Sequence, residues 1–398
     1  MKRILAIILG LCLIIPMVSL SGCTDTGTTQ TTGGETQTTG GNTQTTGGNT
    51  QTTSGTTQKV IQLRTTGASF PKNQIKTWIA KYQKINPNVK IEYQGGGSGQ
   101  GQKDFLKGLT HIGRSDTPVK EKMWNDLKGT GDQPLQFPEI VGAVVITYNI
   151  PEIGNHNLKL SRDVLAGIFI GNIEYWDDER IKSLNPDVAN KLPHKKITVV
   201  HRSDSSGTTA IFTTFLSMIS KEWEEKVGSG KLVEWPTDKM ERGVGGKGNP
   251  GVINTLKNTK YSIAYTELSY TIEEKLPTAA IENRNGKYVI PKDDTIKKAV
   301  SGVKSNIPDP KEGYKEDTKQ LLDAPSDNAY PIVAFTHFLV WENINNKHYS
   351  TEEAKAIKDF LFWVLTDGQK PENLAPGYVG LPQDVANIGL KAAKSIKE

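Results

Sequence analysis

The residues with the clearest potential for chemistry lie in the short stretch 201–209, which holds one arginine, one aspartate, three serines, one glycine and two threonines. A β-branched run, 197–200, precedes it and apolar residues at helical spacing follow it, so the pattern predicts a turn between a strand and a helix. The first turn of a helix has unpaired N–H groups and the positive end of the helix dipole, and both suit an anion. Ser206, Gly207 and Thr208 would present backbone N–H groups and hydroxyls there.

Two charged residues belong to the same turn. The guanidinium of Arg202 is a planar fork of N–H donors that can form two hydrogen bonds to one tetrahedral oxyanion. Asp204 can hold that fork in place. The stretch is therefore a candidate anion site. The competing interpretation is an ordinary N-cap, because Ser, Thr and Asp begin many helices.

Three further polar segments follow predicted strands earlier in the chain. Ser69 lies in the turn after a first strand, Ser98 in a glycine-rich turn after a second, and Asp116 at the end of a short third strand. The helices expected after the first two turns have apolar positions at Ile75, Trp78, Ile79, Tyr82 and Ile85, and at Phe105, Leu106 and Leu109. This order of elements is typical of α/β proteins, in which ligands bind at the carboxyl ends of the strands.

Other ligand classes have weaker support. The glycine-rich segments 94–101 and 243–248 fit neither G-x-G-x-x-G nor G-x-x-x-x-G-K-[ST], so no dinucleotide or P-loop cradle is expected. The six histidines are scattered without metal-ligand spacing, and we expect no metal and no cofactor. The formal net charge is +5 without a basic block, so nucleic acid is not an expected partner.

Taken together, these segments resemble the phosphate-binding protein of the high-affinity phosphate ABC transporter. The resemblance runs from about residue 60 to about 390. Its main motifs are Thr66 to Pro71, Tyr93 to Gly99, Ile112 to Asp116 and Arg202 to Thr208, with shorter matches at 136–138, 182–186, 235–236, 245–249, 263–265 and 330–332.

A few positions depart from the family pattern. Ser205 stands where Gly or another polar residue occurs, His111 where Asp is frequent, and Arg114 where a small residue is common. His111 and Arg114 leave open whether extra positive charge lies near the pocket.

The resemblance implies the type II periplasmic binding protein fold, an α/β fold of two lobes with two hinge-crossing strands and the ligand in the interlobe cleft. The first lobe would hold residues 59–137 and 330–398, and the second lobe residues 138–329. The apolar, β-rich runs 140–146 and 332–340 could cross between the lobes. Two independent domains in tandem are the alternative.

The resemblance also implies a set of ligand contacts. A bound phosphate would receive hydroxyl or backbone hydrogen bonds, or face a charged side chain, at Ser69, Phe70, Ser98, Asp116, Arg202, Ser206, Gly207 and Thr208, with Asp204 supporting Arg202. Many neutral donors and one cation can together replace the water around a dianion.

The N-terminal part of the chain has the pattern of a targeting segment. Lys2 and Arg3 precede an apolar core, and Leu20-Ser21-Gly22-Cys23 resembles a lipobox, so residues 1–23 are predicted to be a signal peptide with lipidation at Cys23. An uncleaved anchor or a simple signal peptide is the alternative. Residues 24–58 repeat Thr-Gln-Thr-Thr-Gly-Gly and predict a disordered tether, because they hold too few apolar side chains for a core.

These features predict an extracytoplasmic monomer, tethered to the outer face of the cell membrane, that binds inorganic phosphate and delivers it to the permease subunits of an ABC transporter. A binding protein for sulfate, molybdate or tungstate is the nearest alternative. A secreted phosphatase is less well supported, because His201 is the sole candidate general base for Ser206. A surface protein on a threonine-rich stalk is a further alternative, and it predicts no tight anion binding.

Overall fold

Eleven strands and thirteen α-helices occur among residues 59–129, 131–301 and 306–398, the part of the chain that the computed structural model describes. The strands are β1 Ile61–Gly67, β2 Val89–Gly95, β3 Ile112–Ser115, β4 Pro134–Asn149, β5 Lys159–Leu160, β6 Thr198–Arg202, β7 Gly243–Gly246, β8 Ser262–Glu267, β9 Ala280–Glu282, β10 Tyr288–Val289 and β11 Val333–Trp341. The helices are α1 Lys72–Ile85, α2 Ser98–Leu106, α3 Glu121–Lys128, α4 Arg162–Ile170, α5 Glu179–Leu184, α6 Gly207–Ile219, α7 Lys221–Lys226, α8 Pro236–Lys239, α9 Gly248–Asn258, α10 Leu268–Glu273, α11 Asp293–Ser301, α12 Thr351–Leu365 and α13 Gln383–Ser395.

The main sheet has the strand order β2-β1-β3-β11-β4-β8-β6-β7. At one end β1 pairs in parallel with β2 and β3, and at the other end β6 pairs in parallel with β7 and β8. The two middle strands, β4 and β11, are antiparallel to each other. We call the β2-β1-β3 end the first half of the sheet and the β8-β6-β7 end the second half. Parallel strands bring their carboxyl ends to one edge, which is where turns can meet a ligand.

Strand β4 links the two halves of the sheet. Its residues 134–143 pair with β11, and its residues 144–149 pair with β8. All but the last of its 16 residues are buried, and its sequence is rich in valine and isoleucine, which suits a strand covered on both faces. The apolar runs 140–146 and 332–340 therefore do form long adjacent strands.

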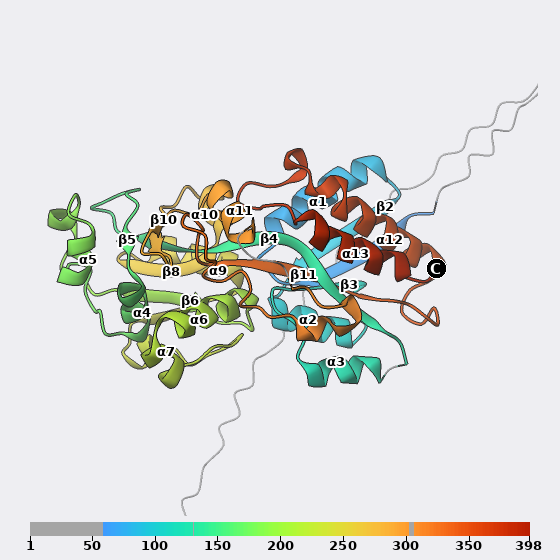
Figure 1. The fold of residues 1–398 in the computed structure, drawn as a ribbon, viewed down its shortest axis with the longest axis horizontal. Helices are drawn as coiled ribbons and strands as arrows, with labels where there is room; N and C mark the ends of the chain where they lie inside the picture. Colours follow the sequence, from blue (N-terminus) through green and yellow to red (C-terminus); the bar gives the residue numbers. More distant parts are fainter. Residues whose placement is uncertain (1–58, 130, 302–305) are drawn as a thin grey trace, which may run out of the picture. The chain divides into compact units, whose positions relative to one another are not determined.

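Helices cover both faces of the first half of the sheet (Figure 1). In Figure 1, α1, α12 and α13 lie on one side of β1 and β3, and α2 and α3 lie on the other. Helix α12, near the C-terminal end, packs against the first elements that the structure describes, because it contacts both β1 and α1. In the second half, α6 contacts β8, and α9 contacts β6, β7 and β8.

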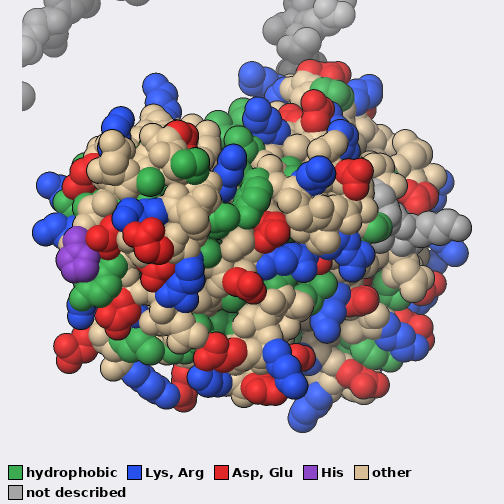
Figure 2. Space-filling view, turned by 60° about the vertical axis from the view of Figure 1, so that its left-hand side comes forward, with side chains coloured by type: hydrophobic (Ala, Val, Ile, Leu, Met, Phe, Trp, Pro, Cys, Tyr) green, Lys and Arg blue, Asp and Glu red, His purple; other side chains and the backbone are tan. Residues whose placement is uncertain are grey.

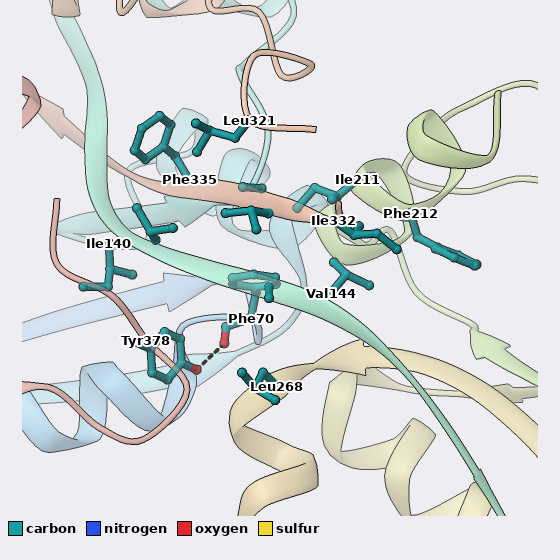
Figure 3. Packing of buried hydrophobic residues seen from close by; sticks show 14 of the residues in the cluster. Phe70, Ile140, Val144, Ile211, Phe212, Leu268, Leu321, Ile332, Phe335 and Tyr378 are labelled. Atoms are coloured by element: carbon teal, nitrogen blue, oxygen red, sulfur yellow. Dashed lines mark hydrogen bonds between the residues drawn. The ribbon is translucent and has the colours of Figure 1, made fainter. Parts of the chain in front are cut away.

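The hydrophobic core is continuous where β4 and β11 run side by side (Figure 3). Phe70 reaches this core from the turn after β1, and its ring occupies the space that a Cβ at Gly142 of β4 would need. Leu268 of α10 and Phe212 of α6 approach from the second half of the sheet (Figure 3). The turn that holds Ser69 and Phe70 is therefore anchored in the core beside the linking strands.

Two expected core positions are wrong. Leu109 is 55% exposed and Ile85 is 60% exposed. Helix α2 ends at Leu106 because Gly108 has a φ of +65°, and the Leu109 N–H donates to the Asp104 carbonyl as the chain turns away. Ile85 is the last residue of α1 and lies past its buried face.

The signal peptide, the tether and Cys23 lie outside the described residues. Within the described part of the chain, no helix combines the length and the apolar character that a membrane span requires. On the face shown in Figure 2, basic and acidic side chains are interspersed and do not form a patch of one sign.

Candidate anion-binding site

Arg202 is the last residue of β6, and its guanidinium is oriented by two bonds to one carboxylate. Its Nε donates to Asp204 Oδ1 at 2.7 Å and its Nη2 to Asp204 Oδ2 at 2.6 Å, while Nη1 lies 3.3 Å from Thr208 Oγ1. The Gly248 N–H also donates to Asp204 Oδ1, at 2.9 Å. Burial raises the pKa of Asp204, but the bonds and charge of Arg202 lower it by more, so its pKa lies below the usual range. The Asp204 carboxylate therefore stays ionised and holds the guanidinium in a fixed orientation.

The turn after β6 begins helix α6 as expected. Ser206 is the N-cap and its Oγ accepts a hydrogen bond from the Thr209 N–H at 3.0 Å. The N-cap interpretation is thus confirmed for Ser206, and it does not compete with an anion site. Gly207 and Thr208 are the first two residues of the helix, whose N–H groups have no intrahelical acceptor.

Asp116 follows β3 and lies beside Ser98, the first residue of α2. Ser98 Oγ lies 3.0 Å from Asp116 Oδ2 and accepts from the Asp116 N–H at 3.0 Å. Thr336 of β11 donates to Asp116 Oδ1 at 2.9 Å. Burial raises the pKa of Asp116 to about 6, although the bonds from Thr336 and Ser98 and the charge of Arg202 oppose this. The carboxyl therefore ionises close to neutral pH.

Ser69 lies opposite the start of helix α9. Its Oγ accepts from the Asn249 N–H at 3.1 Å and lies 3.3 Å from Asn249 Nδ2. The same Nδ2 lies 3.3 Å from Thr208 Oγ1. Asn249 is therefore a central residue of the cluster that our sequence analysis missed as a site residue, although the 245–249 motif contains it. The signal in the sequence was an asparagine directly after a glycine-rich segment at the start of a helix.

The two halves of the sheet touch at this cluster. A Cβ added to Gly207 would collide with Ser98 Oγ and Asp116 Oδ2, and one added to Gly97 would collide with Asp204 Oδ2. The Gly99 N–H donates to the Ser205 carbonyl at 3.0 Å. All the proposed contact residues, from Ser69 to Thr208, are buried. The structure thus brings the predicted phosphate-contact residues close together, and their role as contacts stays a prediction.

We expect Gly207→Ala to impair closure and to leave folding intact. The new methyl group would meet Ser98 and Asp116 of the first half, while alanine is well suited to a helix start. Overpacking of this kind costs about 1–3 kcal/mol, which is about 5- to 150-fold in anion affinity.

Isothermal calorimetry measures the anion affinity of Gly207→Ala, and thermal unfolding shows whether the variant folds. Gly129→Ala, on the surface at the end of α3, is the control. An unchanged affinity in Gly207→Ala would contradict the closed geometry.

The two basic departures from the family pattern, Arg114 and His111, add no unpaired cation to the site. Arg114 is fully buried, forms an ion pair with Glu139 and donates from Nε to Thr65 Oγ1 at 2.9 Å. His111 lies before β3, at the end remote from Asp116, with its Nε2 3.3 Å from a carboxylate oxygen of Glu353. Burial is the main cause that lowers the pKa of His111.

His201 is not positioned as a general base for Ser206. Its Nε2 lies 2.9 Å from Asp238 Oδ1 and its Nδ1 lies 3.1 Å from the Arg202 carbonyl, so both ring nitrogens are engaged. Its ring stacks on Trp235 with 5.1 Å between centroids. Within the described residues, no group of three or more His, Cys, Asp or Glu could hold a metal ion.

Two cavities open beside the cluster. One of about 690 Å³ and one of about 270 Å³ are both lined by Asp204 and Lys247, and the smaller is also lined by Ser69, Lys72 and Gly97. Water therefore reaches the Asp204 side of the cluster, while Asp116 and Ser98 lie deeper.

A family model and the named relatives all match binding proteins. A family model described as a PBP superfamily domain matches residues 26–368. The chain is 67% identical to the phosphate-binding protein PstS of Methanocaldococcus jannaschii, over 100% of this chain and 97% of the relative. It is 38% identical to the phosphate-binding protein PstS of Pasteurella multocida, over 80% of this chain and 86% of the relative.

Solved structures show the same fold at low sequence identity. A high-affinity periplasmic phosphate-binding protein bound with phosphate is similar with a TM-score of 0.63 and 20% identity, over 82% of this chain and 92% of that chain. A phosphate-binding protein from Stenotrophomonas maltophilia is similar with a TM-score of 0.60 and 17% identity, over 83% and 94%. The predicted two-lobe type II fold is therefore confirmed, while the residue boundaries of the lobes stay a prediction.

Proposed function

This chain belongs to the PstS family of phosphate-binding proteins, and we propose that it binds inorganic phosphate outside the cytoplasm and delivers it to the permease of an ABC transporter for import. The observation that carries the proposal is the convergence of Arg202, Asp116 and three hydroxyl-bearing helix starts in one buried cluster. A buried dianion needs a full set of donors to replace its water, and this cluster contains them.

Each element of the cluster has a role in this proposal. Arg202 supplies the charge and a fork that Asp204 keeps in place. Ser69, Ser98, Ser206 and Thr208 would donate from their hydroxyls, and Phe70, Gly207 and Thr208 from their backbone N–H groups. Asp116 would accept a hydrogen bond from the O–H group of hydrogen phosphate. The proposed lobes, 59–137 with 330–398 and 138–329, would close over the ligand about β4 and β11.

Asp116 favours phosphate over sulfate, the nearest rival ligand. Sulfate has no proton at neutral pH, so its oxygen would face the ionised carboxylate without a hydrogen between them. Molybdate and tungstate share this lack of a proton. The cluster is thus better matched to a protonated oxyanion.

Catalysis has less support than binding. His201 is engaged with Asp238, and Ser206 uses its oxygen as the N-cap of α6. The named relatives are binding proteins. Equilibrium binding of labelled phosphate, with p-nitrophenyl phosphate offered in parallel, tests the proposal: we expect one phosphate retained per chain and no p-nitrophenol. Steady release of p-nitrophenol would contradict it.

The N-terminal sequence extends the proposal to location. We infer that cleavage before Cys23 and lipidation of its thiol anchor a monomeric chain at the outer face of the cell membrane, with residues 24–58 as the tether. A chain of that length and composition reaches on the order of 30 Å if it is flexible.

Cys23→Ala is expected to release the protein or leave its precursor uncleaved. The lipid is added to the cysteine sulfur, and alanine provides no attachment point. Mass spectrometry and membrane fractionation of expressing cells measure the outcome, with Ser54→Ala, a change outside the lipobox, as the control. Unchanged mass and unchanged membrane association in Cys23→Ala would contradict the lipid anchor.

A further inference from the structure

Glu267 is a carboxyl in the buried interior, and no cation of the described residues contacts it. It is the last residue of β8 and is 0% exposed. Its Oε1 accepts from the Ser269 N–H at 3.0 Å, and its Oε2 contacts Ser269 Oγ and lies 2.8 Å from the Tyr378 hydroxyl. Among the described residues, none that contacts this carboxyl carries a positive charge. An ionised carboxylate in such a place would be costly.

The number of hydrogens available at the Tyr378 hydroxyl decides the protonation state of Glu267. It lies 2.7 Å from the Phe70 carbonyl oxygen, 2.8 Å from Glu267 Oε2 and 3.1 Å from Ser269 Oγ. The bond to Phe70 is drawn in Figure 3. A phenol has one hydrogen to donate, and a carbonyl oxygen can only accept. If Tyr378 donates to Phe70, the 2.8 Å contact with Glu267 needs a hydrogen from another source.

Ser269 does not supply that hydrogen. Its hydroxyl contacts Glu267 Oε2 and also accepts from Asn73 Nδ2 at 3.0 Å, so its single hydrogen is used toward the carboxyl. With an ionised Glu267, two oxygens would face each other at 2.8 Å with no hydrogen between them. A proton on Oε2, donated to the Tyr378 oxygen, supplies the missing hydrogen, and the longer contact of 3.1 Å between Ser269 Oγ and the Tyr378 hydroxyl is then the one without a hydrogen.

The Ser69–Phe70 turn, which Tyr378 contacts, is part of the proposed anion site. Phe70 and Ser69 are proposed phosphate contacts, and their carbonyls are held by two tyrosines from different segments. Tyr378 donates to the Phe70 carbonyl, and Tyr270 of α10 donates to the Ser69 carbonyl at 2.6 Å. These bonds hold the turn by its carbonyl groups, while the Ser69 hydroxyl contacts Asn249 of the cluster.

We propose that Glu267 holds a proton in the closed protein and, as a neutral carboxyl, positions Tyr378 and through it the Ser69–Phe70 turn for anion binding. This positioning role rests on the proposed function. Glu267 does not contact the anion itself; it acts by fixing which oxygen Tyr378 donates to.

The environment of Glu267 favours its protonated, neutral form. Burial raises the pKa of Glu267 to about 8, the bonds from Ser269 and Tyr378 oppose this, and the charge of Asp116 at the end of β3 raises it further. On α10, Tyr270 and Glu273 are the neighbouring titratable groups, and Arg202 of β6 acts on Tyr270. Because the pKa is raised, the carboxyl holds its proton below about pH 8 and loses it above.

Two measurements on the full chain test the proposal. Difference infrared spectroscopy of the phosphate-loaded parent at pH 7 should show the C=O band of a protonated carboxyl, which fades above about pH 8 and is missing in Glu267→Gln. Asp116 is mostly ionised at pH 7 and should not supply that band.

The second measurement is phosphate affinity. Glutamine can donate to Tyr378 as the neutral acid does, so phosphate affinity in Glu267→Gln should stay within about threefold of the parent. Tyr378→Phe removes the bond to Phe70 and should weaken phosphate binding by about tenfold.

The outcomes separate this inference from the function on which it rests. Glu274→Gln, a change of an exposed carboxylate outside the network, is the control and should alter neither band nor affinity. If Glu267→Gln weakens binding as much as Tyr378→Phe, or if the parent lacks the band, Glu267 is ionised and the proposal fails while phosphate binding stands. If the parent binds no phosphate, the proposed function fails and the positioning role fails with it.

Discussion

Arg202→Ala should lower phosphate affinity by about thirty- to several-thousandfold, which corresponds to about 2–5 kcal/mol for a buried charge left without its partner. Arg202 is 2% exposed, and it is the one arginine of the described cluster whose guanidinium reaches Thr208 at the start of α6. Without it, a bound dianion would keep neutral donors and lose its counter-charge. Asp204 would also remain in the cluster as a carboxylate without a counter-charge, which adds repulsion.

Two further variants make the Arg202 test specific. Arg202→Lys should recover part of the affinity, because the charge returns while the planar fork that engages Asp204 does not. Arg180→Ala, which removes an exposed arginine of α5 paired with Asp178, should bind as the parent does. Calorimetric titration with phosphate gives all three affinities. A loss below threefold in Arg202→Ala would remove Arg202 from the proposed site.

Asp116→Asn should admit sulfate. In the parent, an ionised Asp116 accepts a hydrogen bond from protonated phosphate and presents only an acceptor to sulfate. A site built to pair with a ligand OH can reject the analogue that lacks it by about 10⁴–10⁵-fold. Asparagine can turn its N–H₂ toward a sulfate oxygen, so the exclusion should collapse while part of the phosphate affinity remains.

The pH dependence of this selectivity follows from the pKa of Asp116. Burial raises that pKa to about 6, so the carboxyl is ionised above about pH 6 and protonated below. Sulfate exclusion by the parent should therefore be strong at pH 7.5 and relax below pH 6, where the carboxyl itself can donate a hydrogen bond. Asp116→Asn should show no such pH dependence.

Competition of sulfate against labelled phosphate measures the selectivity of both proteins across this pH range. Asp126→Asn, an exposed change on α3, is the control and should keep the selectivity of the parent. If sulfate is excluded as strongly by Asp116→Asn as by the parent, Asp116 does not select the ligand.

Much of the site could be predicted from the sequence because its parts are local. A strand followed by a hydroxyl-rich turn and an amphipathic helix is a short-range pattern, and it placed Ser206, Gly207 and Thr208 correctly at the start of α6. The same reasoning placed Ser98 at the start of α2 and Asp116 just after β3. The resemblance to a known family then supplied what no local pattern contains, namely that these turns meet.

The parts that sequence reasoning missed depend on contacts between distant segments. Asn249 reaches Ser69 across 180 positions of the chain, and Tyr378 reaches Phe70 across 308. Arg114 looked like a possible source of free positive charge because its partner, Glu139, lies on β4 and not on its own strand. Leu109 looked like a core residue because a helical pattern does not show that a glycine with positive φ ends the helix first.

The central claim is that the closed cluster is a phosphate site, and a calorimetric titration of the full chain with phosphate and then with sulfate at pH 7.5 tests it most directly. The account predicts saturable binding of one phosphate per chain, with sulfate giving no heat of binding and failing to displace phosphate at equal concentration. Tight binding of sulfate, or no saturable binding of phosphate, would contradict it.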